Sequence, residues 1–502
     1  MPAGRAAMSA VRRSILFSAV DKYVAQILLV ATTAVMARIL TPAETGLYLV
    51  AGAMILLVDN FRTFGVGVFI VQAPDLQPET VRSAFTITLL LSVLAGAGVF
   101  AAAGPMADFY GDAELAGLLR LSALSFLAVP FGTPLIALLQ RDLAVRPLAV
   151  ANVAAAVASA AVTVGLGLAG FGAASYVWGF IASGFVTTLV VLAQRPEPWV
   201  FRPCLAGSGR IPAFGTTSAA VTVVNMANDL LPRLIFGRLL GFDAVALYGR
   251  ATTICQLPDR ALVQALQPVV LPAMAAHRRQ GGDLKRSYLH GHAMMSVFQW
   301  PALVMLALLA EPVVRVLLGS QWFGSVPLVR LMAVATMALA PAFMTYPVLV
   351  ATGRIRDTLT SSLIALPPSV LIFWIAANSG VEAAAASLLI AAPLQMGAAL
   401  FFVRRAIGIS IRDLVEASRA SLSATLGTAF IPGLIVALSP NGLAPSWPET
   451  AVALLGGGLG WLAAVRLVRH PVCAEIDGLV ELLARRLSRR TTGLPARANE
   501  GG

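Results

Sequence analysis

The stretch Ala37-Arg38-Ile39-Leu40 returns as Gly237-Arg238-Leu239-Leu240, at an offset of 200 residues. Because both copies are very apolar segments that carry a few ionisable residues, the repeat predicts a membrane transporter of two similar lobes around a polar centre. Further matches extend the two copies, first at the same offset and later at an offset of 210: Leu47-Tyr48 with Leu247-Tyr248, Ala51 with Ala251, Asp59 with Asp259, Leu119-Arg120-Leu121 with Val329-Arg330-Leu331, and Arg146 with Arg356.

The composition also indicates a membrane protein. Hydrophobic residues make up 58% of the chain and charged residues 12%, with a mean hydropathy of +0.82, whereas a soluble domain carries roughly 25% charged residues. The net charge of +12 comes from basic residues scattered in short runs, which argues against a nucleic-acid-binding face. Cys204, Cys255 and Cys473 lie too far apart in sequence to indicate a metal site or a disulfide framework.

About fourteen segments reach the length of roughly 20 apolar residues that a membrane helix needs. The expected fold is therefore an all-α polytopic membrane protein with two pseudo-symmetric six-helix lobes, residues 1–200 and 201–405, and two additional spans within 406–470. The predicted spans are 14–37, 45–71, 83–104, 118–139, 147–169, 172–193, 211–236, 243–275, 290–310, 325–350, 359–378, 382–403, 419–438 and 447–468.

The distribution of Lys and Arg predicts the orientation in the membrane. These residues concentrate in the N-terminal segment, in every second loop and in the C-terminal tail, which places both termini in the cytoplasm. Residues 471–502 are expected to form a cytoplasmic amphipathic helix followed by a disordered tail. The helical spacing that predicts it joins Ile476, Leu479, Val480, Leu483 and Leu487.

Ionisable residues inside membrane spans are costly and usually face a cavity or a partner. They concentrate in the first two predicted spans of each lobe, so we expect these four spans to meet at the lobe interface and line a water-accessible cavity. The other spans have almost no interior charge and are expected to face lipid. The candidate residues are Asp21, Lys22, Asp59, Arg62, Asn225, Asn228, Asp229, Arg233, Arg250, Gln256, Asp259, Arg260 and Gln264.

Two arginines are the preferred candidates for binding an anionic substrate. Arg250 has no acid three or four residues away, and Arg260 points elsewhere than its neighbour Asp259. Guanidinium groups bind phosphate oxygens in a bidentate manner. Lys22, Arg62 and Arg233 supply further cations, although Lys22 and Arg62 are equally consistent with side chains that reach toward the membrane surface or form an ion pair within the membrane. By spacing, Arg62 can pair with Asp59 and Arg233 with Asp229.

The other polar candidates have two expected roles. The carboxylates of Asp21, Asp59, Asp229 and Asp259 suit protons or Na⁺, so coupling to an ion gradient is a hypothesis, and no other cofactor is expected. Arg38 and Arg238, at corresponding helix ends, are interpreted as repeated contacts that fold the lobes.

The segment 37–48, which reads ARILTPAETGLY, and the loop Gln140-Arg141-Asp142-Leu143 resemble the polysaccharide transporter family, the Wzx-type flippases. Its superfamily includes multidrug and toxin extruders and peptidoglycan-precursor flippases. The resemblance implies that the chain flips a polyprenyl-pyrophosphate-linked oligosaccharide across the bacterial inner membrane, for capsule, exopolysaccharide or O-antigen assembly. With such a substrate, the amides of Asn225, Asn228, Gln256 and Gln264 are implied to contact its sugars. The resemblance also implies membrane lipid as a partner, with a polysaccharide polymerase and export machinery as further candidates.

Two other functions remain as alternatives. A multidrug extruder of the same superfamily would more often have twelve spans and an acid-dominated cavity. A membrane glycosyltransferase or polymerase usually needs a sizeable periplasmic loop with catalytic acids or histidines, and the predicted outside loops are short. The four histidines lie at cytoplasmic loops or span ends, without a paired carboxylate or nucleophile nearby in sequence, so we expect a transporter and no catalytic residues.

Overall fold

The computed structural model describes residues 2–62, 66–73, 76–205, 216–260, 282–440 and 442–474, with the single positions 274, 278 and 477. Within these ranges it does not describe the side chains of 2–20, 61, 62, 68, 72, 216–225, 227 and 228. The predicted amphipathic helix of 473–490 and the tail therefore lie almost entirely outside the described residues.

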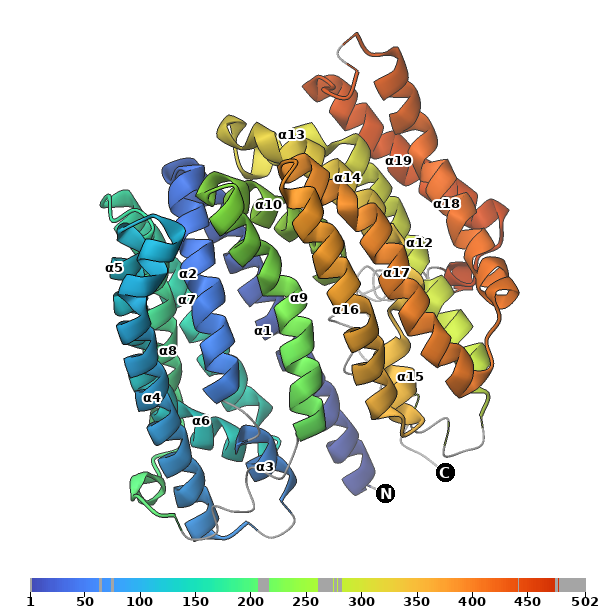
Figure 1. The fold of residues 1–502 in the computed structure, drawn as a ribbon. Helices are drawn as coiled ribbons and strands as arrows, with labels where there is room; N and C mark the ends of the chain where they lie inside the picture. The colour runs from blue at the N-terminus through green and yellow to red at the C-terminus, as the bar shows by residue number, and fades with distance from the viewer. Residues whose placement is uncertain are drawn as a thin grey trace, which may run out of the picture.

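Helices make up the described chain, which confirms the all-α class (Figure 1). The first half of the chain contains α1 (Pro2–Ile39), α2 (Pro42–Arg62), α3 (Val66–Gln72), α4 (Pro78–Tyr110), α5 (Glu114–Ala123), α6 (Ser125–Arg141), α7 (Val145–Leu168), α8 (Ala174–Gln194) and η1 (Pro198–Phe201). The second half contains α9 (Thr216–Leu239), α10 (Phe242–Cys255), α12 (Leu284–Leu308), α13 (Ala310–Leu317), η3 (Ser320–Ser325), α14 (Val326–Met337), η4 (Ala340–Ala342), α15 (Thr345–Ala351), α16 (Ile355–Ala377) and α17 (Val381–Ile407), followed by α18 (Ile411–Leu438) and α19 (Trp447–Leu467).

The described residues contain 11 helices that are long and apolar enough to cross a membrane, or up to 12 if one bent pair is a single span. The predicted number of fourteen is therefore not confirmed. The two remaining predicted spans correspond to α9 and α10. Helix α9 is continuous, but its polar and charged residues Asn225, Asn228, Asp229 and Arg233 lower its mean hydropathy. Helix α10 is too short, with 14 residues.

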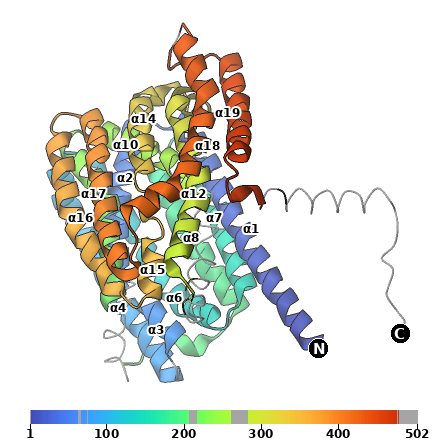
Figure 2. The ribbon, with the colours of Figure 1, turned by 90° about the vertical axis from the view of Figure 1, so that its right-hand side faces the viewer.

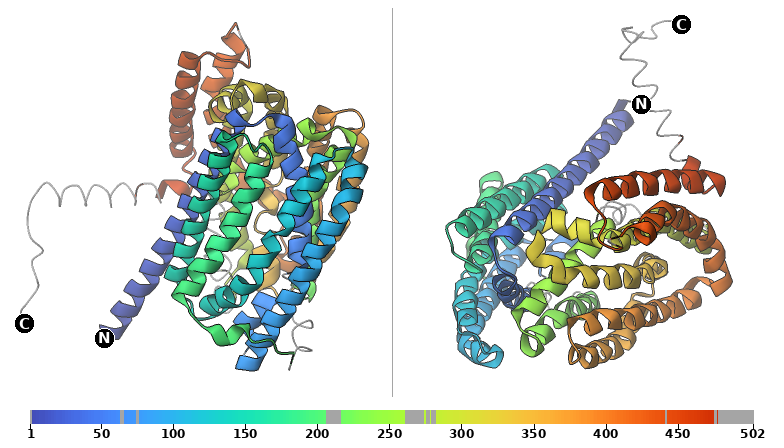
Figure 3. Two further views of the ribbon diagram at one scale, coloured as in Figure 1. Left: turned by 90° about the vertical axis from the view of Figure 1, so that its left-hand side faces the viewer. Right: turned by 90° about the horizontal axis from the view of Figure 1, so that it is seen from above.

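The sequence repeat has a counterpart in two interrupted spans. Leu124 separates α5 from α6 in the first half, and α14 and α15 are bent by 48° in the second. These two spans carry the matched residues Arg120 and Arg330. Seen from above, the two halves of the chain lie beside each other, and α18 and α19 lie at the edge of the second half (Figure 3). We call residues 1–200 and 201–405 the first and second lobe; this division itself stays a prediction.

A capping box fixes the tight turn between α1 and α2. The Thr41 hydroxyl and backbone N–H both donate to Glu44 Oε2 at 2.8 Å, while the Glu44 N–H donates to Thr41 Oγ1 at 3.3 Å. Such reciprocal bonds satisfy the first N–H groups of a helix. The turn therefore positions the end of α1 and the start of α2 next to the second lobe.

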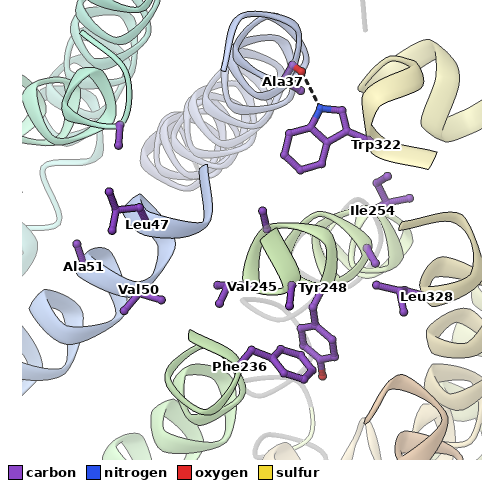
Figure 4. Close-up of a cluster of buried hydrophobic side chains, with 14 of the residues drawn as sticks. Ala37, Leu47, Val50, Ala51, Phe236, Val245, Tyr248, Ile254, Trp322 and Leu328 are labelled. Carbon is purple, nitrogen blue, oxygen red and sulfur yellow. Dashed lines mark hydrogen bonds between the residues drawn. The ribbon is translucent and has the colours of Figure 1, made fainter. Parts of the chain in front are cut away.

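The largest hydrophobic core cluster joins the two lobes (Figure 4). Leu47 and Val50 of α2 lie in the same cluster as Phe236 of α9, Tyr248 of α10 and Trp322 of η3. Helix α2 packs against both α10 and α9. Close packing of these side chains stabilises the observed arrangement of the lobes through van der Waals contact, since lipid is as apolar as the side chains themselves.

Helices α18 and α19 form a hairpin that packs on α12 (Figure 2). Glycines allow its backbones to approach closely, since a Cβ added at Gly460 would fall 2.2 Å from the Gly427 carbonyl oxygen. A hydrogen bond ties the hairpin to the second lobe, since the Ser296 hydroxyl of α12 donates to Ser421 Oγ of α18 at 2.9 Å. Within the hairpin segment, Ser421 Oγ lies 3.3 Å from Nε2 of the buried His470, which follows α19.

Candidate functional site

A cavity of about 310 Å³ lies among α9, α10, α14, α16 and α17. All of its described lining residues belong to the second lobe. The polar ones are Asp229, Arg233, Tyr248, Thr252, Gln256, Arg260, Thr336, Ser369 and Gln395, and the apolar ones include Pro232, Phe373 and Leu388. The structure thus brings together four of the predicted site residues, Asp229, Arg233, Gln256 and Arg260.

The charged groups of the cavity carry a small positive excess. Arg233 and Arg260 face one described acid, Asp229, and both lie within electrostatic range of it. Among the described side chains, no ion pair joins Asp229 to either arginine, although Asp229 and Arg233 lie one helical turn apart. Arg260 instead donates to Gln256 Oε1 at 2.9 Å. An unpaired guanidinium in a partly enclosed cavity is a good partner for an anionic group.

Neutral polar side chains of the cavity were missed by the sequence reasoning. Ser369 of α16 and Gln395 of α17 are linked by a hydrogen bond of 3.3 Å, and Thr252 and Thr336 lie on the same cavity. The expectation that the spans of α14, α16 and α17 only face lipid is therefore wrong. A usable signal was present, because Ser369 follows Pro367-Pro368 and Gln395 lies two residues after Pro393.

A second, narrower crevice runs between the lobes. It is lined by α1, α10 and α13, mostly with apolar side chains such as Leu29, Leu257 and Leu317, together with Gln26. Arg260 lines both this crevice and the larger cavity. One arginine therefore lies at the junction of a polar chamber and an apolar groove between the lobes.

Arg250 is not on either cavity. It is buried, with 7% of its surface exposed, and its Nη2 donates to the Tyr176 hydroxyl of α8 at 2.8 Å. Its guanidinium carbon lies 5.3 Å from the ring centre of Trp322. The predicted contact of Arg250 with substrate stays a prediction, and it requires an arrangement of the lobes other than the one observed.

Three further charged candidates, Asp21, Lys22 and Asp259, lie apart from the described lining of the cavity. Asp21 is buried against α7, where Asn152 donates to its Oδ2 at 3.3 Å and its Oδ1 lacks a described partner. Lys22 is exposed. Asp259 accepts a hydrogen bond from Gln299 of α12. The expected single cavity lined by both lobes is therefore not observed: the charged candidates that share a cavity, Asp229, Arg233 and Arg260, all belong to the second lobe.

Of the five remaining candidates, four have side chains outside the described residues and one lies on neither cavity. The side chains of Arg62, Asn225 and Asn228 and the whole of Gln264 lie outside the described residues. Asp59 is half-buried on α2, and neither described cavity includes it. Within the part of the chain that the structure describes, no group of three or more His, Cys, Asp or Glu residues could hold a metal ion.

The loop at 140–143 holds the predicted cytoplasmic end of the first lobe together. Arg141 Nη1 donates to the carbonyl of Ile70 at 2.9 Å. Arg195, after α8, forms ion pairs with Asp142 at 2.5 Å and Glu197 at 2.6 Å. Burial alone would lower the pKa of Arg195, but the hydrogen bonds to Glu197 and Asp142 raise it above its ordinary value. This loop therefore contributes to the fold rather than to the cavity.

A family model described as "Polysaccharide biosynthesis protein" matches residues 35–327. The chain is 22% identical to the lipopolysaccharide biosynthesis protein WzxC of Escherichia coli (strain K12), over 60% of this chain and 61% of WzxC. It is 25% identical to the succinoglycan biosynthesis transport protein ExoT of Rhizobium meliloti (strain 1021), over 64% of this chain and 65% of ExoT. The chain thus spans less than two thirds of the length of these curated relatives.

Two solved structures share the fold. One is titled lipid II flippase MurJ in an inward closed conformation, with a TM-score of 0.73 at 14% identity, covering 90% of this chain and 98% of that one. The other is an inward-facing multidrug resistance transporter of the MATE family, with a TM-score of 0.61 at 15% identity, covering 76% and 94%. These two similarities show that the chain has the fold shared by MurJ and the MATE-family transporter.

Proposed function

Because the chain belongs to the polysaccharide biosynthesis protein family, we propose that it flips a polyprenyl-pyrophosphate-linked oligosaccharide across the bacterial inner membrane, from the cytoplasmic to the periplasmic leaflet. Three similarities support this proposal. WzxC is named as a lipopolysaccharide biosynthesis protein, ExoT is named as a succinoglycan biosynthesis transport protein, and the chain shares its fold with the lipid II flippase MurJ. The observation that carries the proposal is the position of Arg260 at the junction of the polar cavity and the apolar crevice.

The two parts of such a substrate need different surroundings. A pyrophosphate needs cations, which Arg260 and Arg233 supply, and sugar hydroxyls need amides and hydroxyls, which Gln256, Ser369 and Gln395 supply. The polyprenyl chain needs an apolar path. The crevice beside α1 has the apolar lining for one and reaches Arg260, but its volume is only about 20 Å³, so the lobes would have to separate there to admit the chain. The substrate can thus keep its lipid in the bilayer while its head group enters the cavity.

Coupling to an ion gradient is part of the proposal. Asp229 is the described acid that lines the cavity, and it shares this lining with hydroxyl and amide side chains whose oxygens suit Na⁺ as a ligand set. Asp21, buried against Asn152 in the first lobe, is the second candidate. Transport in vesicles that ignores both the proton and the Na⁺ gradient would remove ion coupling from the mechanism.

The proposed setting is the inner membrane with both termini in the cytoplasm. A polysaccharide polymerase and the export machinery are the partners that would consume the flipped product. Rocking of the two lobes about their interface would alternate access to the cavity.

The test deletes the gene in its host and follows surface polysaccharide and lipid-linked oligosaccharide in both leaflets. Rescue is compared for the wild type, Arg260→Gln and the control Arg412→Gln, which removes an exposed charge at the start of α18. Loss of one charge-assisted contact of roughly 1.5–3 kcal/mol should slow flipping about tenfold or more in Arg260→Gln. The control should rescue like the wild type.

The result has three readings. Single-repeat lipid-linked units trapped in the cytoplasmic leaflet, with rescue by wild type and control, support a flippase that uses Arg260. Full rescue by Arg260→Gln removes this residue from the site. Normal polysaccharide in the deletion strain, with altered sensitivity to cationic compounds, would replace the flippase by a multidrug extruder.

A further inference from the structure

One end of the molecule is closed by contacts between the lobes (Figure 1). The C-terminal ends of α1 and α9, the starts of α2 and α10, and η3 all lie at the end opposite to the N-terminus. By the predicted topology this is the periplasmic end. Two sets of contacts close it, which we call the α1 clasp and the α9 clasp after the helix that each one holds.

The α1 clasp binds the carbonyl groups at the end of α1. Trp322 of η3 is fully buried, and its Nε1 donates to the Ala37 carbonyl at 2.6 Å (Figure 4). Gln321 donates to the same carbonyl and to that of Leu40, the latter at 3.2 Å. Because these carbonyls end a helix and lack partners within it, the second lobe supplies the hydrogen bonds that α1 is missing.

The α9 clasp exchanges the lobes, since a residue of the first lobe holds α9, but it binds a carbonyl inside the helix and not one at its end. Tyr110, at the end of α4 in the first lobe, donates its hydroxyl to the Leu234 carbonyl of α9 at 3.3 Å. The guanidinium of Arg238 lies 5.2 Å from the ring centre of Phe109. In the α1 clasp the matching arginine, Arg38, donates to the Val316 carbonyl at 2.8 Å. The repeated arginines are thus contacts between the lobes.

Arg250 adds a group that only the α1 clasp has. It reaches from α10 to Tyr176 of the first lobe, whose ring stacks on Tyr48 at 4.5 Å, and its guanidinium lies over Trp322. Its Nε is buried and has no hydrogen-bond partner. Among the described residues, no carboxylate pairs with it.

A buried cation without a counter-charge opposes the structure that buries it. Removing a guanidinium from water is costly, and one neutral hydrogen bond with one aromatic contact returns only part of that cost. Opening this end of the molecule would return Arg250 to water. The hydrogen bonds of the two clasps therefore favour the closed state, whereas the burial of Arg250 favours the open one.

We propose that Arg250 is a destabilising element built into the seal, which keeps the closed end of the transporter able to open. Tyr176 limits this effect by supplying the hydrogen bond that Arg250 has in the closed state. The inference concerns the opening of the molecule and holds for any transported substrate.

The test measures how fast a cysteine in the cavity reacts with a membrane-impermeant maleimide added from the periplasmic side. The reporter is Thr336→Cys in a chain whose natural cysteines, Cys204, Cys255 and Cys473, are replaced by alanine. Tyr176→Phe removes the hydrogen bond to the buried guanidinium, so it should raise the labelling rate about tenfold. The double variant Arg250→Met, Tyr176→Phe removes charge and hydroxyl together, so it should label at least about threefold more slowly than the parent.

The opposite signs of these two changes are the decisive result. If the double variant also labels faster than the parent, Arg250 stabilises the seal and the proposal is wrong. Tyr110→Phe weakens the α9 clasp without touching Arg250 and should raise the rate, which shows that labelling follows the seal. If Tyr110→Phe and Tyr176→Phe both leave the rate unchanged, the clasps do not close this end.

Two controls keep the outcome independent of folding and of the substrate. Each variant must elute as one species in detergent and give the parent's labelling rate after unfolding in denaturant. The same reagent applied from the cytoplasmic side, in inverted vesicles, tests the predicted orientation of the seal. Because labelling requires no sugar substrate, it can succeed even if the proposed cargo is wrong.

Discussion

At Gly46, near the start of α2, the two lobes approach so closely that a side chain has no room. A Cβ at this position would fall 1.8 Å from the carbonyl oxygen of Phe242 in the second lobe. Gly52, two turns further along the same helix, has 3.9 Å to the nearest atom that its Cβ would meet. The two glycines therefore differ in what they contribute, although both lie in one helix.

We predict that Gly46→Ala pushes the lobes apart at their sealed end. Overpacking of this kind costs about 1–3 kcal/mol, so thermal unfolding of the purified protein should occur at a lower temperature and the Thr336→Cys reporter should label faster. The matched control Gly52→Ala should change neither value. Equal behaviour of the two variants would contradict the close approach at Gly46.

Single residues were predictable from the sequence where a local rule applies. Thr41 and Glu44 have the spacing of a capping box, and the structure contains that box. The contacts of Arg250 could not be predicted. A charged residue in a predicted span indicates that its side chain needs a polar partner, but the sequence does not show which neighbouring helix its side chain faces. Ser369 and Gln395 gave a weak signal, since neutral polar groups cost little in a membrane helix.

At the scale of elements, the hairpin of α18 and α19 depends on glycines that face each other. Gly427 and Gly460 lie in contact, whereas Gly433 and Gly458 meet nothing within 4 Å. We predict that Gly427→Leu separates the two helices and lowers the thermal stability of the protein, while Gly433→Leu leaves it unchanged. Melting temperatures in detergent measure both, and a drop of similar size in the two variants would contradict the role of the close approach.

The stability of this hairpin segment should depend on pH through His470, which joins α18 to the residues after α19. The Val472 N–H donates to His470 Nδ1 at 3.1 Å, so the neutral ring accepts there, and protonation of Nδ1 breaks this bond. Burial, with the nearby His290 as a smaller cause, lowers the pKa of His470 below its ordinary value. As the pH falls below about 6.5, the unfolded chain takes up a proton that the folded chain resists, so stability is lost.

This prediction is tested by thermal unfolding between about pH 7.5 and 5.5, a window around the ordinary pKa of histidine. The wild type should lose stability toward the acidic end. His470→Asn retains an acceptor for the Val472 N–H without the titrating ring, so its loss should be smaller. A wild-type melting temperature that stays constant over this range would show that His470 does not couple the hairpin to pH.

At the scale of the whole molecule, transport by rocking lobes requires the sealed end to open. We predict that Leu40→Cys, Gln321→Cys, a pair placed where Gln321 reaches the Leu40 carbonyl at 3.2 Å, stops transport when cross-linked by a short reducible reagent. Reduction should restore it. The measurement is accumulation of lipid-linked oligosaccharide in the complemented deletion strain, with each single cysteine variant as control. Normal transport by the cross-linked protein would exclude opening at this end.

The membrane class and the all-α fold were predictable, because a chain of long apolar segments permits few other folds. The division into two lobes stays a prediction. The position of the cavity was not predictable. The sequence placed it between the lobes, since the charges lie on the first two spans of each, but Asp21 faces α7 and the described lining of the cavity comes from the second lobe. The position of the cavity depends on contacts between helices that are far apart in sequence, and hydrophobic periodicity does not predict such contacts.

The exchange of partners between the α1 and α9 clasps bears on the ancestry of the chain. Each lobe offers a helix end to be held and a segment that holds the other's, which is the form of an isologous interface between two identical subunits. A half-length ancestor could therefore close this end as a homodimer, and fusion of two duplicated copies would have preserved the exchange of partners, while the bonded carbonyls, at Ala37 and Leu40 in one clasp and Leu234 in the other, have come to differ. Tyr176, Arg250 and Trp322, which meet in one clasp alone, mark where the fused halves have since diverged.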